Sequence, residues 1–253
     1  MTAAPDHLPP GLDLQGSVLR PVRGHHAFEA CVEQLATAIR LGVFPLGCTL
    51  PSERDVAERL HVSRATLREA MAALRQAGLV ETTRGRGGGT VVTLKPKTPS
   101  ARAAARISAA TRADWLDSLD FRRIVEPGAA QLAAQRSTEG DLDDEARRQL
   151  TDALDHVAAA RKPAAHRQAD SRFHLTVAAL SGSPRAIEAV TAVQSTLHQM
   201  LLTIPVLDAN IAHSDRQHST VVRAILAGRP DRARHAMEQH CDDTAALLRG
   251  LVG

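Results

Sequence analysis

The chain has 253 residues, of which 43% are hydrophobic and 23% are charged, and both values are ordinary for a soluble globular protein. This length fits one large or two small domains, and the apolar content is enough to build a core, which excludes global disorder. Only four Phe, one Trp and no Tyr are present, against 12 His. The scarcity of aromatic residues argues against a β-sandwich rich in Tyr and Trp. It also argues against a reader of single-stranded nucleic acid that stacks bases on aromatic side chains.

The charge is distributed unevenly along the chain. Residues 1–94 carry a net charge of +1, residues 95–112 carry +5 and residues 113–253 carry −3, within a total of +3. A basic first part and a mildly acidic second part suggest two different tasks. We expect the first part to bind a polyanion.

The cysteines and the start of the chain indicate where the protein works. Cys31, Cys48 and Cys241 lie far apart and form no CxxC pair, which indicates reduced thiols in a cytoplasmic protein. No apolar run approaches 18 residues and no basic stretch precedes an apolar one at the start, so we expect neither a membrane span nor a secretory signal. Pro and Gly recur within residues 1–24, which we expect to form a flexible tail.

Three helices are predicted after this tail. The first covers about residues 27–40, and Ser52 and Ser63 are suitable N-caps for two more, at about residues 53–60 and 64–77. In each segment apolar residues recur at spacings of three and four, which is typical of an amphipathic helix. The residues expected on the buried faces are Phe28, Val32, Leu35, Ala36 and Ile39, then Val56 and Leu60, then Leu67, Ala70, Met71 and Leu74.

The apolar period then changes from helical spacing to two. Residues 79–83 and 90–94 are predicted strands, and the glycine-rich segment between them carries Arg84 and Arg86. Three helices followed by a β-hairpin is the order of a winged helix-turn-helix. We therefore place a winged helix-turn-helix domain at residues 25–94.

The rest of the chain is patterned as helix. Residues 95–112 are basic and contain two prolines, so we predict an interdomain linker there. Residues 113–250 are predicted to form an all-α bundle, whose helices are separated by Gly and Pro. The fold class is therefore mainly α, with a winged helix-turn-helix joined to a bundle of about six helices: residues 113–135, 139–160, 164–181, 184–204, 213–227 and 230–249.

Arginines gather on the third predicted helix. Arg64, Arg68 and Arg75 form one stripe beside its buried face. Guanidinium groups suit guanine edges and phosphates, and the start of a helix adds affinity for anions. Arg54, in the first turn of the preceding helix, would approach the same groove. Any one of these arginines is readily explained as part of a solvated surface, but the whole set predicts binding of double-stranded DNA.

Several short motifs of this region occur in a fixed order: Leu50-Pro51-Ser52-Glu53-Arg54, Val62 to Ala70, Gly78-Leu79-Val80 and Gly85-Arg86-Gly87. Together they resemble the GntR family of bacterial transcription regulators. The resemblance implies that the DNA contacts come from Arg54, Ser63, Arg64, Thr66, Arg68, Arg84 and Gly85. Cys48 departs from the family pattern, because many members have an acidic residue at this position.

Three histidines and one aspartate of the second part form a second candidate site. Asp170 and His174 are four residues apart on one predicted helix, so their side chains project together. His218 and His240 lie on apolar faces of two other predicted helices, where imidazoles need partners. The four groups would suit a divalent transition metal such as zinc. Taken singly, however, each histidine is more often a hydrogen-bonded core residue, and an Asp–His pair is often only an ion pair.

Four stretches resemble the FCD effector domain of FadR-type members of the GntR family: Asp170 to His174, His218 with Ala224-Ile225, His240, and Arg122 to Pro127. The resemblance implies that the aspartate and the three histidines hold a metal ion, with zinc first and nickel or manganese as alternatives. It also implies that Arg122 lies near the pocket, where it can meet an acidic effector.

These resemblances predict a ligand-responsive transcription regulator and not an enzyme. They imply a homodimer that binds a palindromic operator as a repressor and releases it when a small metabolite, such as a carboxylate, enters the metal-containing pocket. A metal hydrolase fused to a DNA-binding head is an alternative, but the chain has no HExxH motif and no obviously placed general base. A metal sensor, for which the metal itself is the signal, is the other alternative.

Overall fold

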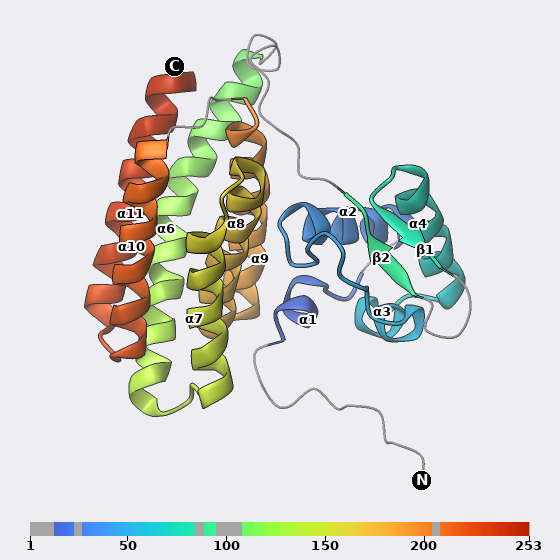
Figure 1. Ribbon diagram of the computed structural model, residues 1–253, viewed down its shortest axis with the longest axis horizontal. Coiled ribbons are helices and arrows are strands. Elements are labelled where there is room, and N and C mark those ends of the chain that lie inside the picture. The colour runs from blue at the N-terminus through green and yellow to red at the C-terminus, as the bar shows by residue number, and fades with distance from the viewer. Residues whose placement is uncertain (1–12, 23–26, 84–88, 95–107, 204–207, 253) are drawn as a thin grey trace.

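The computed structural model describes residues 13–22, 27–83, 89–94, 108–203 and 208–252. Figure 1 shows two lobes side by side, a tall helical bundle and a smaller head made of helices and a two-stranded sheet. Within these residues, no helix combines the length and the apolar character needed to cross a membrane.

The head has the predicted winged helix-turn-helix arrangement. It consists of α2 (Ala27–Arg40), α3 (Glu53–Leu60), α4 (Arg64–Gln76) and the antiparallel strands β1 (Val80–Thr82) and β2 (Thr90–Val92). The side chains of Ser52 and Ser63 accept hydrogen bonds from backbone N–H groups in the first turns of α3 and α4, so both N-caps are confirmed. Between α3 and α4 the chain turns at His61, which adopts a left-handed conformation (φ 53°).

The strands are shorter than the hydrophobic pattern predicts, but their register matches it. Val80 pairs with Val92, and both side chains are buried against the head core. A slip by one residue would turn this apolar pair toward solvent, which fixes the register. One predicted core position is wrong, because Phe28 in the first turn of α2 is 37% exposed.

The second lobe is a bundle of six helices among the described residues. They are α6 (Ala109–Glu139), α7 (Asp144–Ala159), α8 (Pro163–Leu180), α9 (Pro184–Leu201), α10 (Asp208–Leu226) and α11 (Pro230–Val252). The helix α6 packs against α8, α9, α10 and α11 and is therefore the centre of the bundle. The predicted mainly α fold with about six bundle helices is confirmed.

Helix boundaries differ from the sequence prediction at three points. The helix α6 begins inside the predicted linker, because Ser108 accepts a hydrogen bond from the backbone of Thr111 and forms an N-cap. It continues to Gly140, whose left-handed conformation (φ 82°) ends it and delays the start of α7. The helix α10 starts five residues earlier than predicted. The remainder of the predicted linker, residues 95–107, lies outside the described residues.

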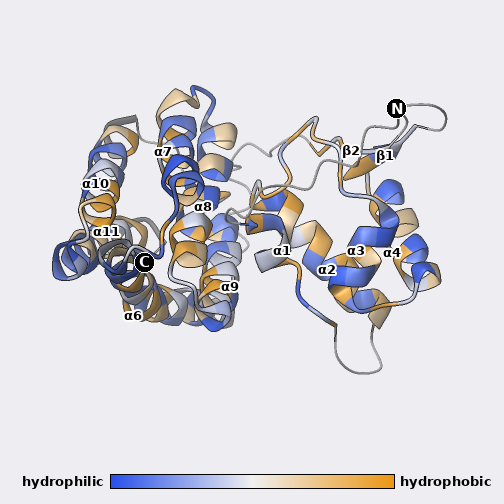
Figure 2. Cartoon of the chain, turned by 90° about the horizontal axis from the view of Figure 1, so that it is seen from below, coloured by the Kyte–Doolittle hydropathy of each residue, from blue (hydrophilic) through white to orange (hydrophobic). Residues whose placement is uncertain are grey.

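The segment before α2 corrects the expectation of a flexible tail. Residues 13–22 include the short helix α1 (Leu14–Val18) and lie between the two lobes (Figures 1 and 2). The side chain of Leu19 is buried, and the guanidinium of Arg20 forms an ion pair of 2.6 Å with Glu188 on α9. Apolar burial and ion pairing thus hold this segment against both lobes, whereas residues 1–12 lie outside the described part of the chain.

Head and bundle are joined by a common core. Leu175 on α8 and Ile187 on α9 belong to the same buried apolar cluster as the core of the head. The side chain of Gln168, also on α8, donates hydrogen bonds to the carbonyl groups of Ile39 and Arg40 at the end of α2. These last carbonyls of a helix have no partner within the helix, so the bundle satisfies a backbone requirement of the head.

Candidate functional site

The predicted DNA-reading residues lie on one exposed side of the head. Arg64 and Arg68 project from α4, and Nε of Arg68 donates a hydrogen bond of 3.1 Å to Oε2 of Glu53 at the start of α3. Arg75 reaches the hydroxyl of Thr82 on β1. A cleft of about 350 Å³ is lined by Arg68, Glu53, Arg75 and Thr82. Two helices and the wing therefore meet at a single basic surface.

The other predicted DNA contacts take different local roles. Arg54 is largely exposed and pairs only loosely with the neighbouring carboxylate, at 3.5 Å. Ser63 and Thr66 hydrogen-bond each other at the start of α4 while Ser63 also caps the helix. Arg84 and Gly85 lie outside the described residues. The contacts of all these side chains with DNA stay predictions.

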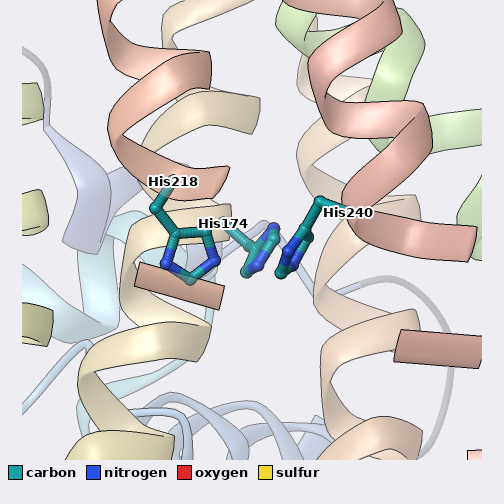
Figure 3. Close-up of side chains that lie close together, drawn as sticks. All are labelled: His174, His218 and His240. Atoms are coloured by element: carbon teal, nitrogen blue, oxygen red, sulfur yellow. The ribbon is translucent and has the colours of Figure 1, made fainter. Parts of the chain in front are cut away.

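The candidate metal ligands come together inside the bundle. His174 on α8, His218 on α10 and His240 on α11 are all buried and point toward one another, as Figure 3 shows. One ring nitrogen from each lies within 4.8 Å of the others. The carboxylate of Asp170 is 3.5 Å from Nε2 of His218 and 4.0 Å from Nε2 of His174. All four residues singled out in the sequence therefore lie together.

This donor set fits a divalent transition metal. Imidazole nitrogens and carboxylates bind such ions at about 2.0–2.2 Å, so two ligands of one ion are at most about 4.4 Å apart. The separations within the cluster are close to that limit. Among the described residues Nδ1 of His218 has no hydrogen-bond partner, although it is buried, and a buried polar atom of this kind requires a partner.

The surroundings keep two of these imidazoles neutral. Burial, helped by Arg122 and the neighbouring histidine rings, lowers the pKa of His218 to about 3 against the opposing effect of Asp170. Burial also holds the pKa of His240 well below its ordinary value, helped by His218 and Arg122. A neutral imidazole keeps a lone pair for a metal ion, so both side chains are in the protonation state that a ligand needs.

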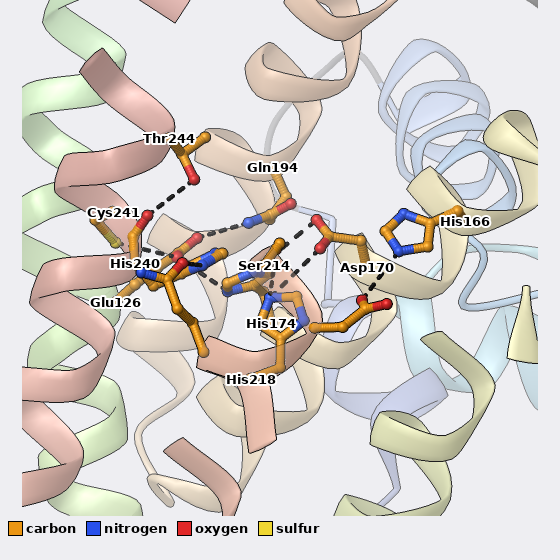
Figure 4. A network of polar contacts seen from close by, with 12 residues as sticks. Glu126, His166, Asp170, His174, Gln194, Ser214, His218, His240, Cys241 and Thr244 are labelled. Carbon is orange, nitrogen blue, oxygen red and sulfur yellow. Dashed lines mark hydrogen bonds and ion pairs between the residues drawn. The ribbon is translucent and has the colours of Figure 1, made fainter. Parts of the chain in front are cut away.

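Arg122 lies at the centre of the cluster, and Figure 4 shows the polar network of the site. Its Nε donates to Oε2 of Glu126 over 2.9 Å, and its NH2 lies 3.1 Å from Nε2 of His240 and 3.4 Å from Nε2 of His174. Burial alone would lower the pKa of Arg122, but Glu126 raises it above its ordinary value. The guanidinium is therefore a permanent buried cation beside the imidazoles.

Glu126 balances this cation. Burial would raise its pKa, but the positive charge of Arg122 and the interaction with the His174 ring hold the pKa well below its ordinary value. Gln194 on α9 donates to the other carboxylate oxygen over 2.6 Å. Nδ1 of His174 lies 3.0 Å from Oε2 of Glu126. The carboxylate thus binds an arginine, an amide and a ligand histidine.

Sequence reasoning did not assign a role to Glu126, Gln194 or Gln217. Glu126 stands four residues after Arg122 on one helix, and this spacing was an available signal. Gln194 and Gln217 lie on other helices than their partners, and nothing in their local sequence marks them. Two histidines without an evident partner in the sequence also have one: His166 lies 3.2 Å from Asp215, and His213 lies 2.9 Å from Asp243.

Comparison with known proteins agrees with this arrangement. Residues 28–92 match the gntR family of bacterial regulatory proteins, and residues 117–243 match the FCD domain. The chain is also similar over 90% of its length to the solved structure of McbR/YncC from Escherichia coli, with a TM-score of 0.53, 16% identity and 99% of that chain covered. At this identity the structural likeness supports the fold alone.

Relatives of similar length carry names of regulators. RmpR of Mycobacterium gastri, named for an HTH-type transcriptional regulator, is 30% identical over 89% of this chain and 81% of its own length. The Glc operon transcriptional activator of Escherichia coli is 29% identical over 84% and 85%, and the HTH-type transcriptional repressor NanR of Cronobacter sakazakii is 28% identical over 92% and 89%.

The two family matches fall on the two lobes in the same order as the motifs of the sequence. The head supplies the DNA-binding surface, and the bundle supplies the polar cluster. The family consists of transcription regulators and not of enzymes. The chain therefore belongs to the GntR family of DNA-binding bacterial transcription regulators and carries an FCD domain after its winged head.

Proposed function

We propose that the protein is a cytoplasmic repressor that leaves its operator when a small carboxylate binds the metal-containing pocket of the bundle. The observation that carries this proposal is the buried cluster around Arg122. Three imidazoles, the guanidinium and the carboxylate of Glu126 are buried there, and the carboxylate of Asp170 lies beside them. Such a concentration of buried polar groups is costly to maintain unless it binds a ligand.

The chemistry of the cluster favours a metal and an acid together. Asp170, His174, His218 and His240 would hold zinc, or else nickel or manganese. The bound ion would supply Lewis-acid coordination of a carboxylate oxygen. Among the described residues NH1 of Arg122 is buried and has no hydrogen-bond partner, so it can donate to a second carboxylate oxygen.

Apolar residues on α6 support a homodimer. Phe121, Ile124 and Leu132 are exposed, and with Gly128 they follow one side of the helix at spacings of three and four. A Cβ added to Gly128 would meet nothing within 4 Å, so the backbone is open to close approach there. We name these four residues the α6 stripe. A second copy placed on it would give two heads for the half-sites of a palindrome.

The test compares His174→Ala with Arg68→Ala, using purified protein and the DNA upstream of its own gene. We expect wild-type protein to contain metal, to bind this DNA and to release it in the presence of one of a panel of small carboxylates. His174→Ala should lose the metal and the release. Arg68→Ala should keep the metal and lose sequence-specific binding, because the wing and phosphate contacts alone carry little sequence information.

The outcomes separate the parts of this proposal. Unchanged metal content in His174→Ala, measured by elemental analysis, would refute the metal site. Sequence-specific binding by Arg68→Ala would refute its role in recognition. Release of the DNA by metal addition alone would identify the metal itself as the signal.

A further inference from the structure

A chain of hydrogen bonds leads from the buried His240 to the surface between α10 and α11. Nδ1 of His240 lies 3.1 Å from Oε1 of Gln217, and Nε2 of Gln217 donates to Oδ2 of Asp243 over 2.7 Å. The same carboxylate oxygen is 2.9 Å from Nε2 of His213. Gln217 and His213 line a surface hollow of about 150 Å³, so the outer end of this chain reaches the surface.

Elementary hydrogen-bond chemistry fixes the direction of each contact. The carboxylate of Asp243 only accepts, so the amide nitrogen of Gln217 must face it. The amide oxygen of Gln217 then faces His240, and because it too can only accept, Nδ1 of His240 must carry the proton.

A contact on the other edge of the ring leads independently to the same tautomer. Nε2 of His240 is 3.1 Å from NH2 of Arg122, and a guanidinium can only donate. Nε2 must therefore carry the lone pair. The contacts on both edges of the His240 ring therefore indicate that Nδ1 is protonated and that Nε2 carries the lone pair that a metal ion would use.

We infer that Gln217 is a positioning residue of the metal centre, which holds His240 in the tautomer and orientation that offer Nε2 to the ion. Asp243 acts one step further out, by fixing the direction of the Gln217 amide. The inference rests on the proposed function, because it concerns the same metal site. Removing an acceptor of this kind from a ligand histidine typically weakens metal binding about 10–100-fold.

Gln217 is a better test than the corresponding partner of His174. Nδ1 of His174 lies 3.0 Å from Glu126, so a carboxylate stands where the amide of Gln217 stands for His240. Glu126, however, is buried and neutralises Arg122, so its removal disturbs the fold. Gln217 is only half-buried and bears no charge, so it can be changed with little effect on the core.

The experiment measures zinc affinity by competition with a chromophoric chelator. Gln217→Leu should bind zinc about 10–100-fold more weakly than wild type. Gln239→Leu is the matched control, because Gln239 lines the same hollow and precedes His240, but no hydrogen bond found among the described residues joins it to a ligand histidine. The double variant Gln217→Glu with Asp243→Asn exchanges donor and acceptor along the same contact and should restore affinity to within about threefold of wild type.

Spectroscopy provides a reading that does not depend on metal. Long-range ¹⁵N–¹H correlation spectra of the zinc-free protein should show the proton of His240 on Nδ1 in the wild type. In Gln217→Leu Arg122 still faces Nε2, so the proton should stay on Nδ1 but exchange faster with water, because its acceptor is lost. Equal zinc affinity in Gln217→Leu and Gln239→Leu, or a wild-type proton on Nε2 of His240, would overturn the inference. Wild-type protein that binds no zinc would instead refute the metal site of the proposed function, while the spectra would still test the role of Gln217.

Discussion

At the scale of single residues, the most demanding feature is the buried pair of Arg122 and Glu126. Their side chains are 1% and 2% exposed, and they are 2.9 Å apart. Two charges removed from water are tolerated only when each finds the other and further hydrogen bonds. Gln194 supplies one such bond, and the imidazole nitrogens of His174 and His240 face the guanidinium. The pair therefore contributes to the stability of the bundle as well as to the proposed site.

We predict that Glu126→Leu destabilises the zinc-free protein by about 3–5 kcal/mol, because it leaves Arg122 charged and buried. Adding Arg122→Met should recover most of this loss, since no unpaired charge then remains. Urea unfolding of the single and double variants measures both values. Glu145→Leu serves as the comparison, because Glu145 pairs with Arg148 in an exposed i,i+3 pair that should contribute about 0–1 kcal/mol. A loss below about 1 kcal/mol in Glu126→Leu would contradict the prediction.

The sequence indicated the candidate ligands of the metal site but not the residues that hold them in place. The i,i+4 spacing marked Asp170 and His174, and apolar surroundings marked His218 and His240, because both signals are local to one helix. Gln217 supports His240 across 23 residues, on a different helix. A contact of this kind depends on how two helices are rotated and shifted relative to each other, and no local pattern contains that information.

At the scale of elements, the same limit explains what the sequence missed between the lobes. Caps, turns and apolar periods predicted the winged head and the number of bundle helices. The segment before α2 was expected to be mobile because proline and glycine indicate only that regular structure is interrupted. This segment is held in place by residues far away in the sequence, as the ion pair of Arg20 with Glu188 shows. The helix α8 likewise carries two candidate metal ligands, Asp170 and His174, and also Gln168, which holds the end of α2. A shift of α8 on ligand binding would thus reach the head directly.

Gly42 offers a test of the contact between the end of α2 in the head and α8 in the bundle. It has a left-handed conformation (φ +75°), and an added Cβ would stand 3.0 Å from the carbonyl oxygen of Gln168. Gly47 has a similar conformation (φ +85°) with nothing within 4 Å. We expect Gly47→Ala to cost about 1–2 kcal/mol through backbone strain alone. Gly42→Ala should lower the stability further, because α8 must also move away from the added methyl group. Thermal unfolding compares the stability of the two variants. Equal losses of stability would show that α8 can move away from α2 without cost.

At the scale of the whole molecule, the charge distribution takes on a structural meaning. The small net charge of +3 combines a head that presents arginines on one face with a mildly acidic bundle. One head alone offers a single recognition helix, and its ion pairs with DNA are weakened by salt. Two heads linked through their bundles would bind two half-sites together, which raises the apparent affinity without any new contact. The α6 stripe is the surface that we assign to this pairing.

Ile124 is the best residue with which to test the pairing, because it is 71% exposed in the single chain and central in the α6 stripe. We predict that Ile124→Glu sediments as one chain of 27.0 kDa, since burying two new carboxylates against each other would oppose association. Its affinity for a two-half-site operator should fall about 100-fold or more, as the second head is lost. Leu46→Glu replaces an equally apolar, 52% exposed residue of the head, and it should leave the sedimenting mass of the wild type unchanged. A dimeric Ile124→Glu would place the dimer interface elsewhere. A monomeric wild type would contradict the proposal of a homodimer bound to a palindromic operator.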